Sequence, residues 1–495
     1  MKPGPIFNQD CTEFFVVNPP DKISGETVDV FVDSLAAAGV AALFSNINAQ
    51  RANYDSAVRE TYWYGYDPTG PDEQPYFVGY PKERLPVARP MIDAMLALVK
   101  QGVDFHARAI ARCHAHGMEG WISLRMNDVH DVELSASPQL NTVWNTHPEW
   151  RRVPYRFERA FDRQLDYARP EVRANYWVLI EEVLNRYDLD GLELDFMRFP
   201  YYFRIGHELE GGRILTAWLR DVRALCAAAR LGHPVKLAVR VPAEPETARQ
   251  MGLDGADWAH EGLIDLLVAT PFWETTDTAL PIRLWRRLLE GTQVTLAAGL
   301  EILVRPYWEG SLSYQTPETS TGNALAALYE GADRAYLFNH FCDMPGQRTG
   351  MWNKADAERV FRAMSSVATL DRLSRRHVVT YRDTQAPGEV GNKLLPATGK
   401  LAIFRLHTGP RPAGRKVQVV LGFENESPRP ALFKPPAVRV HAVLCPGIAQ
   451  VQGTNAVYDV PGEALGDEIH TVEVESTDGQ PFKIVWVEMS VAARE

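Results

Sequence analysis

The sequence of 495 residues contains few cysteines and no long hydrophobic run. Its five cysteines are scattered, odd in number and without CxxC spacing: Cys11, Cys113, Cys226, Cys342 and Cys445. This pattern predicts buried thiols in a reducing compartment rather than a disulfide framework or a zinc site. No stretch is long and apolar enough to span a membrane, and no charged segment followed by an apolar core marks a signal peptide. We therefore expect a cytoplasmic protein without a membrane partner, although a mature secreted chain would look the same.

Other absences narrow the function classes. The net charge is −11, and no basic run offsets it, which argues against a nucleic-acid partner. The sequence has no Gly-rich phosphate loop, no GxGxxG after its first predicted strand, no GxSxG elbow and no HExxH. These gaps weaken the dinucleotide-binding, serine-hydrolase and metalloenzyme alternatives. We expect no cofactor and no metal, and the oligomeric state stays open.

Short apolar segments alternate with helical periodicity over most of the chain. Predicted strands are residues 13–17, 41–46, 121–126, 190–196, 235–241, 263–270, 294–300 and 334–338. Predicted helices are residues 27–38, 89–116, 171–186, 214–230, 280–289, 323–330 and 354–368. Parallel strands with helical crossovers are the α/β pattern. Eight of them predict a (β/α)8 TIM barrel over residues 1–372.

The pattern changes after residue 372. Short β-type runs at 401–406, 416–423, 438–444, 470–474 and 482–489 are separated by Gly, Pro, Asn and Asp clusters, without a helical period. This predicts a second domain, residues 373–495, that is a small antiparallel β-sandwich. Such a domain either binds carbohydrate or supports the barrel, and the sequence favours neither.

Acidic and apolar residues alternate in segment 190–200. Side chains alternate between the faces of a strand, so Glu193 and Asp195 share one face. Carboxylates on the inner face of a buried strand are unfavourable unless they are paired or used. One interpretation is a structural ion pair with Arg198 or Arg125. The favoured one is an acid/base carboxylate at the C-terminal end of a barrel strand.

The same segment resembles the fourth-strand motif of the "family-ten-like" glycosyl hydrolases, Asp-Gly-Ile-His-Phe-Asp-Asp-Tyr with a Pro shortly after. Asp190, Gly191 and Asp195 match it, and segments 147–150 and 252–265 look like the same family. The resemblance covers the barrel and implies a TIM barrel that acts on a glycosidic bond. Glu193 stands where that family often has His, and Phe196 replaces its second Asp.

A fainter likeness links the chain to family-eighteen chitinases, whose fourth strand reads Asp-Gly-x-Asp-x-Asp-x-Glu. Asp190, Glu193 and Asp195 map onto its three aspartates. The catalytic Glu of that motif falls on Met197, which cannot give or take a proton. This argues against a chitinase-like, substrate-assisted mechanism.

Polar residues occur at nearly every predicted strand end, where the chemistry of a barrel is located. Each could be an ordinary cap or loop residue, but the mixture of carboxylates, amides, Arg and aromatics suits a sugar. The predicted substrate-binding residues are Asn46, Asn48, Arg51, Arg125, Asn127, Asp128, His130, Arg198, Arg240, Trp273, Asn339 and His340.

Glycoside hydrolysis requires two carboxyl groups across the scissile bond. We expect Asp195 to be the general acid, with Glu193 one layer deeper raising its pKa by like-charge repulsion. The partner carboxylate is expected to be Glu301, then Glu274, with Asp128 third.

The sequence therefore predicts a glycoside hydrolase that cleaves O-glycosidic bonds of an oligo- or polysaccharide. A sugar-acid lyase or isomerase remains an alternative, because Arg125, Arg198 and Arg240 could hold a carboxylate. A non-catalytic carbohydrate-binding protein on the same scaffold is the third interpretation.

Overall fold

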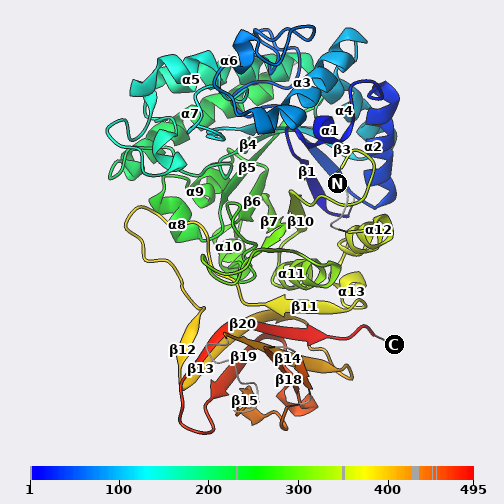
Figure 1. Cartoon of the computed structure of the whole chain (residues 1–495), viewed down its shortest axis with the longest axis vertical. Coiled ribbons are helices and arrows are strands. Elements are labelled where there is room, and N and C mark those ends of the chain that lie inside the picture. The colour runs from blue at the N-terminus through cyan, green and yellow to red at the C-terminus, as the bar shows by residue number, and fades with distance from the viewer. Residues whose placement is uncertain are drawn as a thin grey trace.

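The chain folds into a barrel with a β-sandwich packed against one flank (Figure 1). The computed structural model describes residues 3–494 apart from 230–231, 348–351, 425–433, 449 and 453. Over these ranges, no helix combines the length and apolar character needed to cross a bilayer. All five cysteines are free and buried, which confirms the prediction of buried thiols.

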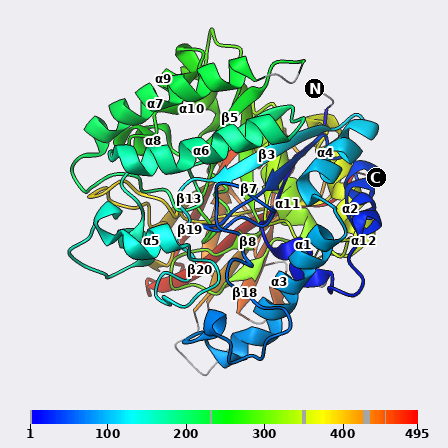
Figure 2. The same cartoon turned by 90° about the horizontal axis from the view of Figure 1, so that it is seen from above.

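Eight parallel strands close into a barrel in the order β1-β10-β7-β6-β5-β4-β3-β2, which confirms the predicted TIM barrel. The strands are β1 (Ile6–Gln9), β2 (Ala42–Asn46), β3 (Glu119–Arg125), β4 (Gly191–Asp195), β5 (Lys236–Pro242), β6 (Leu266–Thr270), β7 (Thr295–Glu301) and β10 (Arg334–Phe338). Figure 2, seen from above, shows helices surrounding these strands. A short hairpin, β8 (Leu303–Val304) with β9 (Ser313–Tyr314), follows β7.

The helices of the barrel domain are α1 (Glu13–Val17), α2 (Gly25–Ala37), α3 (Leu85–Lys100), α4 (Phe105–Ala115), α5 (Thr142–Thr146), α6 (Pro170–Arg186), α7 (Glu208–Ala228), α8 (Pro245–Gln250), α9 (Gly255–His260), α10 (Ile282–Leu288), α11 (Pro317–Tyr329), α12 (Lys354–Ala363) and α13 (Val367–Leu370). The predicted helix 89–116 is two helices. Gly102 adopts φ +71° between them, and the Asp104 carboxylate caps α4 by accepting backbone N–H groups of His106 and Ala107.

The prediction of a strand at residues 13–17 is wrong. The Asp10 carboxylate accepts the backbone N–H groups of Thr12 and Glu13 at 2.8 and 3.1 Å. This local capping starts helix α1, although its Phe-Phe-Val-Val run has strand propensity. The first barrel strand, β1, is only four residues long and includes the polar Asn8.

The barrel interior is apolar at its base and polar toward the carboxyl ends of the strands. Phe44 and Trp121 stack with ring centroids 4.6 Å apart. The Trp121 ring fills the space beside Gly191, where a Cβ would lie 2.3 Å from it. Two residues further along β4 comes Glu193, and then Asp195. Leu192 and Leu194 belong to the core outside the barrel, so the predicted alternation along this strand is confirmed.

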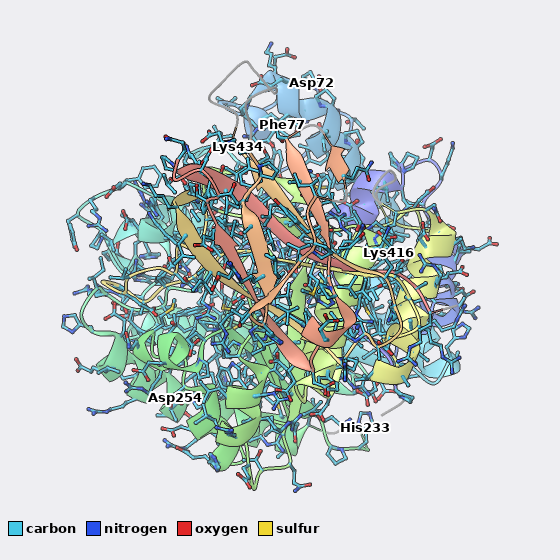
Figure 3. All side chains as sticks on the ribbon, turned by 90° about the horizontal axis from the view of Figure 1, so that it is seen from below. Asp72, Phe77, His233, Asp254, Lys416 and Lys434 are labelled. Atoms are coloured by element: carbon cyan, nitrogen blue, oxygen red, sulfur yellow. The ribbon has the colours of Figure 1, made fainter. Side chains whose placement is uncertain are left out.

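The C-terminal strands form two antiparallel sheets around their own apolar core. One contains β11 (Arg375–Val378), β20 (Phe482–Val491), β14 (Val417–Phe423), β18 (Asn455–Asp459) and β17 (Gln450–Gln452), with β12 (Ala397–Gly399) also paired to β20; the other contains β13 (Leu401–Gly409), β19 (Glu468–Glu475), β15 (Ala437–Val440) and β16 (Val443–Leu444). The predicted β-sandwich is confirmed. Figure 3, seen from below, shows these strands in front of the barrel, with Lys416 labelled among them.

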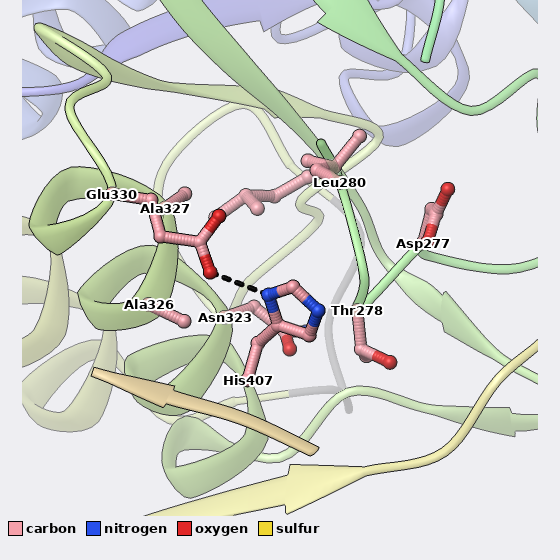
Figure 4. Close-up of a pocket in the computed structure, with 9 residues that line it drawn as sticks. Asp277, Thr278, Leu280, Asn323, Ala326, Ala327, Glu330 and His407 are labelled. Atoms are coloured by element: carbon pink, nitrogen blue, oxygen red, sulfur yellow. Dashed lines mark hydrogen bonds and ion pairs between the residues drawn. The ribbon is translucent and has the colours of Figure 1, made fainter. Parts of the chain in front are cut away.

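The sandwich packs closely on α11. A Cβ at Gly322 of this helix would lie 2.2 Å from the backbone oxygen of Arg376 on β11, so only glycine permits this approach. Nearby, the His407 ring of β13 pairs with the Glu330 carboxylate beside a cavity of about 10 Å³ (Figure 4). The two domains therefore share a tight, partly polar interface.

Residues 379–396, here called the linker, connect β11 to β12 and run past loops that follow the barrel strands (Figure 1). The Asp383 carboxylate accepts the backbone N–H groups of Phe272, Trp273 and Glu274 at 2.9 to 3.0 Å. Arg382 forms ion pairs with Glu244 and Asp277. The linker thereby fixes the loops after β5 and β6.

Candidate active site

Charged side chains converge inside the barrel at the carboxyl ends of four strands. Arg125 on β3, Asp195 on β4, Arg240 on β5 and Glu301 on β7 are all 3% exposed or less. Arg198 and His130 join them from the loops after β4 and β3. The sequence analysis placed all six at strand ends, and the structure brings them together.

The Asp195 side chain accepts hydrogen bonds from three donors. Its Oδ1 accepts the backbone N–H groups of Met197 and Arg198 at 2.9 and 3.0 Å, because the chain turns directly after β4. Its Oδ2 accepts from Arg240 Nη1 at 2.7 Å. The ion pair weighed in the sequence analysis therefore exists, but its cation is Arg240 rather than Arg198 or Arg125.

Glu193 lies one layer deeper and has a different environment. Its Oε2 accepts from the Tyr336 hydroxyl at 2.9 Å and from Asn8 Nδ2 at 3.3 Å. Burial, and then the negative charge of Asp195, raise the pKa of Glu193 to about 8. The like-charge repulsion expected between the two residues therefore acts on Glu193, where it adds to the larger effect of burial.

Glu301 is the carboxyl group at the end of β7. Its Oε1 accepts the backbone N–H of Ile302 at 2.9 Å, and its buried Oε2 has no hydrogen-bond partner in the described ranges. Burial raises the pKa of Glu301 well above its usual value, although the charges of Arg198 and Arg240 oppose this. The ends of β4 and β7 therefore carry one ion-paired carboxyl group and one whose pKa is raised by burial.

A chain of charged and polar groups crosses the mouth of the barrel. Arg125 donates to Asp10 at 2.6 Å and to Asp128 at 3.2 Å. His130 Nδ1 lies 2.7 Å from Asp128 Oδ1, and its Nε2 lies 2.6 Å from Arg198 Nη2. Since a guanidinium only donates, Nε2 accepts and Nδ1 carries the ring proton. The network thus fixes the His130 tautomer and the Arg198 orientation.

Arg198 is surrounded by aromatic rings. Its guanidinium carbon lies 5.9, 5.4 and 5.6 Å from the ring centroids of Phe272, Trp273 and Phe338. Burial lowers the pKa of Arg198 to about 10, so the side chain is a cation at neutral pH. Its Nε and Nη1 are buried and have no hydrogen-bond partner among the described residues.

A cleft of about 900 Å³ opens among the loops at this end of the barrel. Its walls come from the loops after β3, β4, β6 and β7 and from the linker, with the aromatic residues Phe161, Tyr201, Phe272, Tyr307, Trp308 and Tyr381. Glu274 also lines it, and burial raises the pKa of this carboxyl group. Phe272 belongs both to the cleft wall and to the aromatic surroundings of Arg198.

Several predicted substrate-binding side chains form hydrogen bonds to backbone groups within the protein. Asn48 bonds the backbone N–H and oxygen of Arg125. Asn127 bonds the backbone N–H and oxygen of Leu165. Such bonds shape the loops and leave these amides little capacity for a ligand.

Some of the other predicted binding residues form hydrogen bonds that hold loops in place, and others lie at the mouth of the barrel. Arg51 donates to the Leu140 backbone oxygen at 2.8 Å, and the buried His340 ring contacts the Ser320 hydroxyl at 3.3 Å. Asn339 has φ +54° directly after β10. Asn46 donates to the Ser123 backbone, but its buried Oδ1 has no partner within the described structure.

Sequence reasoning missed Asn8, Asp10, Tyr336 and Asp383. Asn8 lies in β1 and Asp10 directly follows it, whereas the analysis placed the first strand at residues 13–17, so a correct first strand would have revealed them. The Tyr336 hydroxyl looked like ordinary core in an apolar strand. Asp383 lies in the linker, where nothing in the sequence indicates contact with the loop after β6.

Within the described ranges, no group of three or more His, Cys, Asp or Glu side chains is arranged to hold a metal ion. No family profile matches the chain, and no curated protein matches it in sequence.

Solved structures with similar folds include an endo-β-1,4-mannanase from Thermotoga petrophila, 11% identical, with TM-score 0.44 and coverage of 100% of this chain and 98% of that one. They also include a maltogenic α-amylase from Thermotoga neapolitana, 10% identical, with TM-score 0.40 and coverage of 99% and 98%. An endo-1,4-β-mannanase from Rhizomucor miehei is 10% identical, with TM-score 0.41 and coverage of 75% and 94%. The function is therefore argued from the site.

Proposed function

We propose that the protein is a glycoside hydrolase that cleaves O-glycosidic bonds by carboxyl acid/base catalysis. The observation that carries this proposal is the contrast between two buried carboxyl groups at the ends of β4 and β7: Asp195 is ion-paired with Arg240, whereas burial raises the pKa of Glu301 well above its usual value. Carboxyl groups with opposed protonation are what glycosidic bond cleavage requires. Arg240 interacts with both of them.

In this proposal Glu301 is the general acid and Asp195 is the base or nucleophile, the reverse of the roles expected from the sequence. An acid must carry a proton before the bond breaks, and a base or nucleophile must be charged. Arg240 and the turn after β4 stabilise the charged form of Asp195. Glu274, on the cleft wall, is the alternative acid because burial also raises its pKa.

The aromatic lining supports a sugar as substrate. The side chains of Trp273 and Trp308 are 40% and 52% exposed, and Trp308 lines the cleft. Exposed indole faces stack on the apolar C–H face of a pyranose. In this proposal the glycan lies in the cleft, whose wall includes Phe272 next to the Arg198 guanidinium.

A reducing-sugar assay on a glycan panel tests the proposal. The parent and the surface control variants Asp21→Asn and Glu171→Gln are expected to release reducing ends from at least one glycan. Asp195→Asn and Glu301→Gln are expected to lose about 10²- to 10⁴-fold of this activity. Equal activity of Asp195→Asn and the parent would contradict the proposal. Binding of a glycan without turnover would indicate a carbohydrate-binding protein instead.

A sugar-acid lyase is the second candidate, and the unpaired nitrogens of Arg198 favour it because a lyase must bind the substrate carboxylate. Elimination leaves an unsaturated product that absorbs ultraviolet light, and hydrolysis does not. Recording the absorbance during the same panel separates the two reactions.

A further inference from the structure

We propose that Arg198 binds an anionic substituent of the sugar, either the carboxylate of a uronic acid or a sulfate ester, and so selects acidic glycans. This inference rests on the proposed function, since it names the class of sugar that the same site accepts. Four observations support it.

First, Arg198 is the cation of this cluster without an anionic partner. Arg125 pairs with Asp10 and Asp128, and Arg240 pairs with Asp195. In the described part of the chain no carboxylate lies within 4.0 Å of Arg198, whose polar partner is the accepting nitrogen of His130. A buried cation without a counter-ion is unfavourable, and an anionic ligand would relieve this.

Second, the free donors of Arg198 have a fixed direction. Arg198 is only 4% exposed, and its Nη2 donates to His130 Nε2 at 2.6 Å. Nε and Nη1 are buried without partners among the described residues, and so is Glu301 Oε2. Arg198 is also the strongest charge acting on Glu301. Guanidinium donors therefore lie close to the proposed acid, and charge-assisted bonds to them are strong.

Third, the cleft is much less acidic than the protein, whose net charge is −11. Its lining has five cationic side chains, Arg152, Arg156, Arg159, Arg382 and Lys393, and five acidic ones, Glu158, Asp162, Glu274, Glu309 and Asp383. Burial raises the pKa of both Glu274 and Asp383. The cationic side chains of the cleft therefore offset its acidic ones, which favours an anionic glycan more than the overall charge of the protein does.

Fourth, Trp273 places an apolar ring face beside the guanidinium. Its ring centroid lies 5.4 Å from the Arg198 guanidinium carbon, and the side chain is 40% exposed. A pyranose stacked on this ring could direct a substituent toward Nε and Nη1. The pair thus combines a stacking surface with an anion-binding group, as acidic-sugar recognition requires.

Isothermal titration calorimetry with small sugars tests the inference directly. The probes are glucuronate, galacturonate and glucose 6-sulfate, with glucose and galactose as neutral counterparts. The parent is expected to bind at least one acidic sugar about 10- to 100-fold more tightly than its neutral counterpart, which is the range for hydrogen bonds to charged groups. Preference for a uronate or for the sulfate distinguishes the two anion chemistries.

Arg198→Gln is expected to lose this preference, Arg198→Lys to keep part of it, and the surface control Arg213→Gln to keep all of it. Circular dichroism checks that each variant folds. If Arg198→Gln does not fold, the comparison of the parent with Arg198→Lys tests the inference, because lysine keeps the positive charge and lacks the paired N–H donors of the guanidinium. Equal binding of acidic and neutral sugars by the parent, or an unchanged preference in Arg198→Gln or in a folded Arg198→Lys, would overturn the inference.

Activity data separate the inference from the proposed function. Hydrolysis of neutral glycans alone, unaffected by Arg198→Gln, would refute acidic selection and leave the hydrolase proposal standing. Arg198-dependent binding of uronates without hydrolysis would refute the hydrolase proposal and support the anion site. Hydrolysis of acidic glycans with a KM raised about 10- to 100-fold in Arg198→Gln supports both.

Discussion

Arg240 on β5 donates from Nη1 to Asp195 Oδ2 on β4 at 2.7 Å, and both side chains are 1% exposed or less. The two residues are register partners on neighbouring strands, so the barrel itself positions the pair. Asp195 in turn adds to the effect of burial in raising the pKa of Glu193. This contact therefore links the charges at the ends of β4 and β5.

Replacement of Asp195 by Asn should destabilise the fold. The substitution leaves Arg240 buried without a counter-ion, which costs about 3–5 kcal/mol. The double variant Asp195→Asn/Arg240→Met should recover part of this loss, and urea denaturation of both single variants and the double variant measures the coupling. Independent, additive effects would show that the pair is not coupled as described.

Glu193→Gln should change how stability depends on pH. The folded pKa of Glu193, about 8, lies above the usual 4.5, so between these values the folded protein binds one proton more than the unfolded chain. The contribution of this group to the free energy of unfolding therefore falls by about 1.4 kcal/mol per pH unit as pH rises through this window. Glu193→Gln should remove that fall, so the stability of the variant relative to the parent should increase as pH rises. Parallel pH profiles of the two proteins would contradict the assignment.

Asp383→Ala should loosen the loop after β6. The change removes the acceptor of three backbone N–H groups, at Phe272, Trp273 and Glu274. Since this loop borders the cleft and Arg198, we expect a higher KM and faster limited proteolysis of the loop. Glu389→Ala is the matched control, because Glu389 anchors the same linker on Thr247 instead. Equal effects of the two changes would show a general role of the linker rather than a specific role of Asp383.

Gly322→Ala should disturb the contact between the barrel and the sandwich. The added Cβ would meet the Arg376 backbone oxygen at 2.2 Å, and overpacking of this kind costs about 1–3 kcal/mol. Thermal unfolding should show a lower Tm than in the parent. Gly462→Ala, where the added Cβ meets nothing within 4 Å, should leave Tm unchanged. An unchanged Tm in Gly322→Ala would contradict the close approach.

The barrel and the inward face of β4 could be predicted because period-two alternation is a local property of the sequence. The partner of Asp195 could not, since Arg240 lies 45 residues away and its register with β4 is set by barrel closure. The raised pKa of Glu301 could not be predicted either, because it results from burial, which no strand pattern reports. The prediction of the first strand was wrong because residues 13–17, despite their strand propensity, form helix α1, whose start is held by the Asp10 carboxylate.

The most direct test of the central claim compares an aryl and an alkyl glycoside of the same sugar, which differ in leaving group. A dinitrophenyl group departs without protonation, whereas an alkyl alcohol needs the acid. The account predicts that Glu301→Gln retains near-parental kcat/KM on the dinitrophenyl glycoside and loses about 10²- to 10⁴-fold of kcat/KM on the alkyl glycoside, while Asp195→Asn loses activity on both. Equal losses of Glu301→Gln on the two substrates, or an active Asp195→Asn, would contradict it.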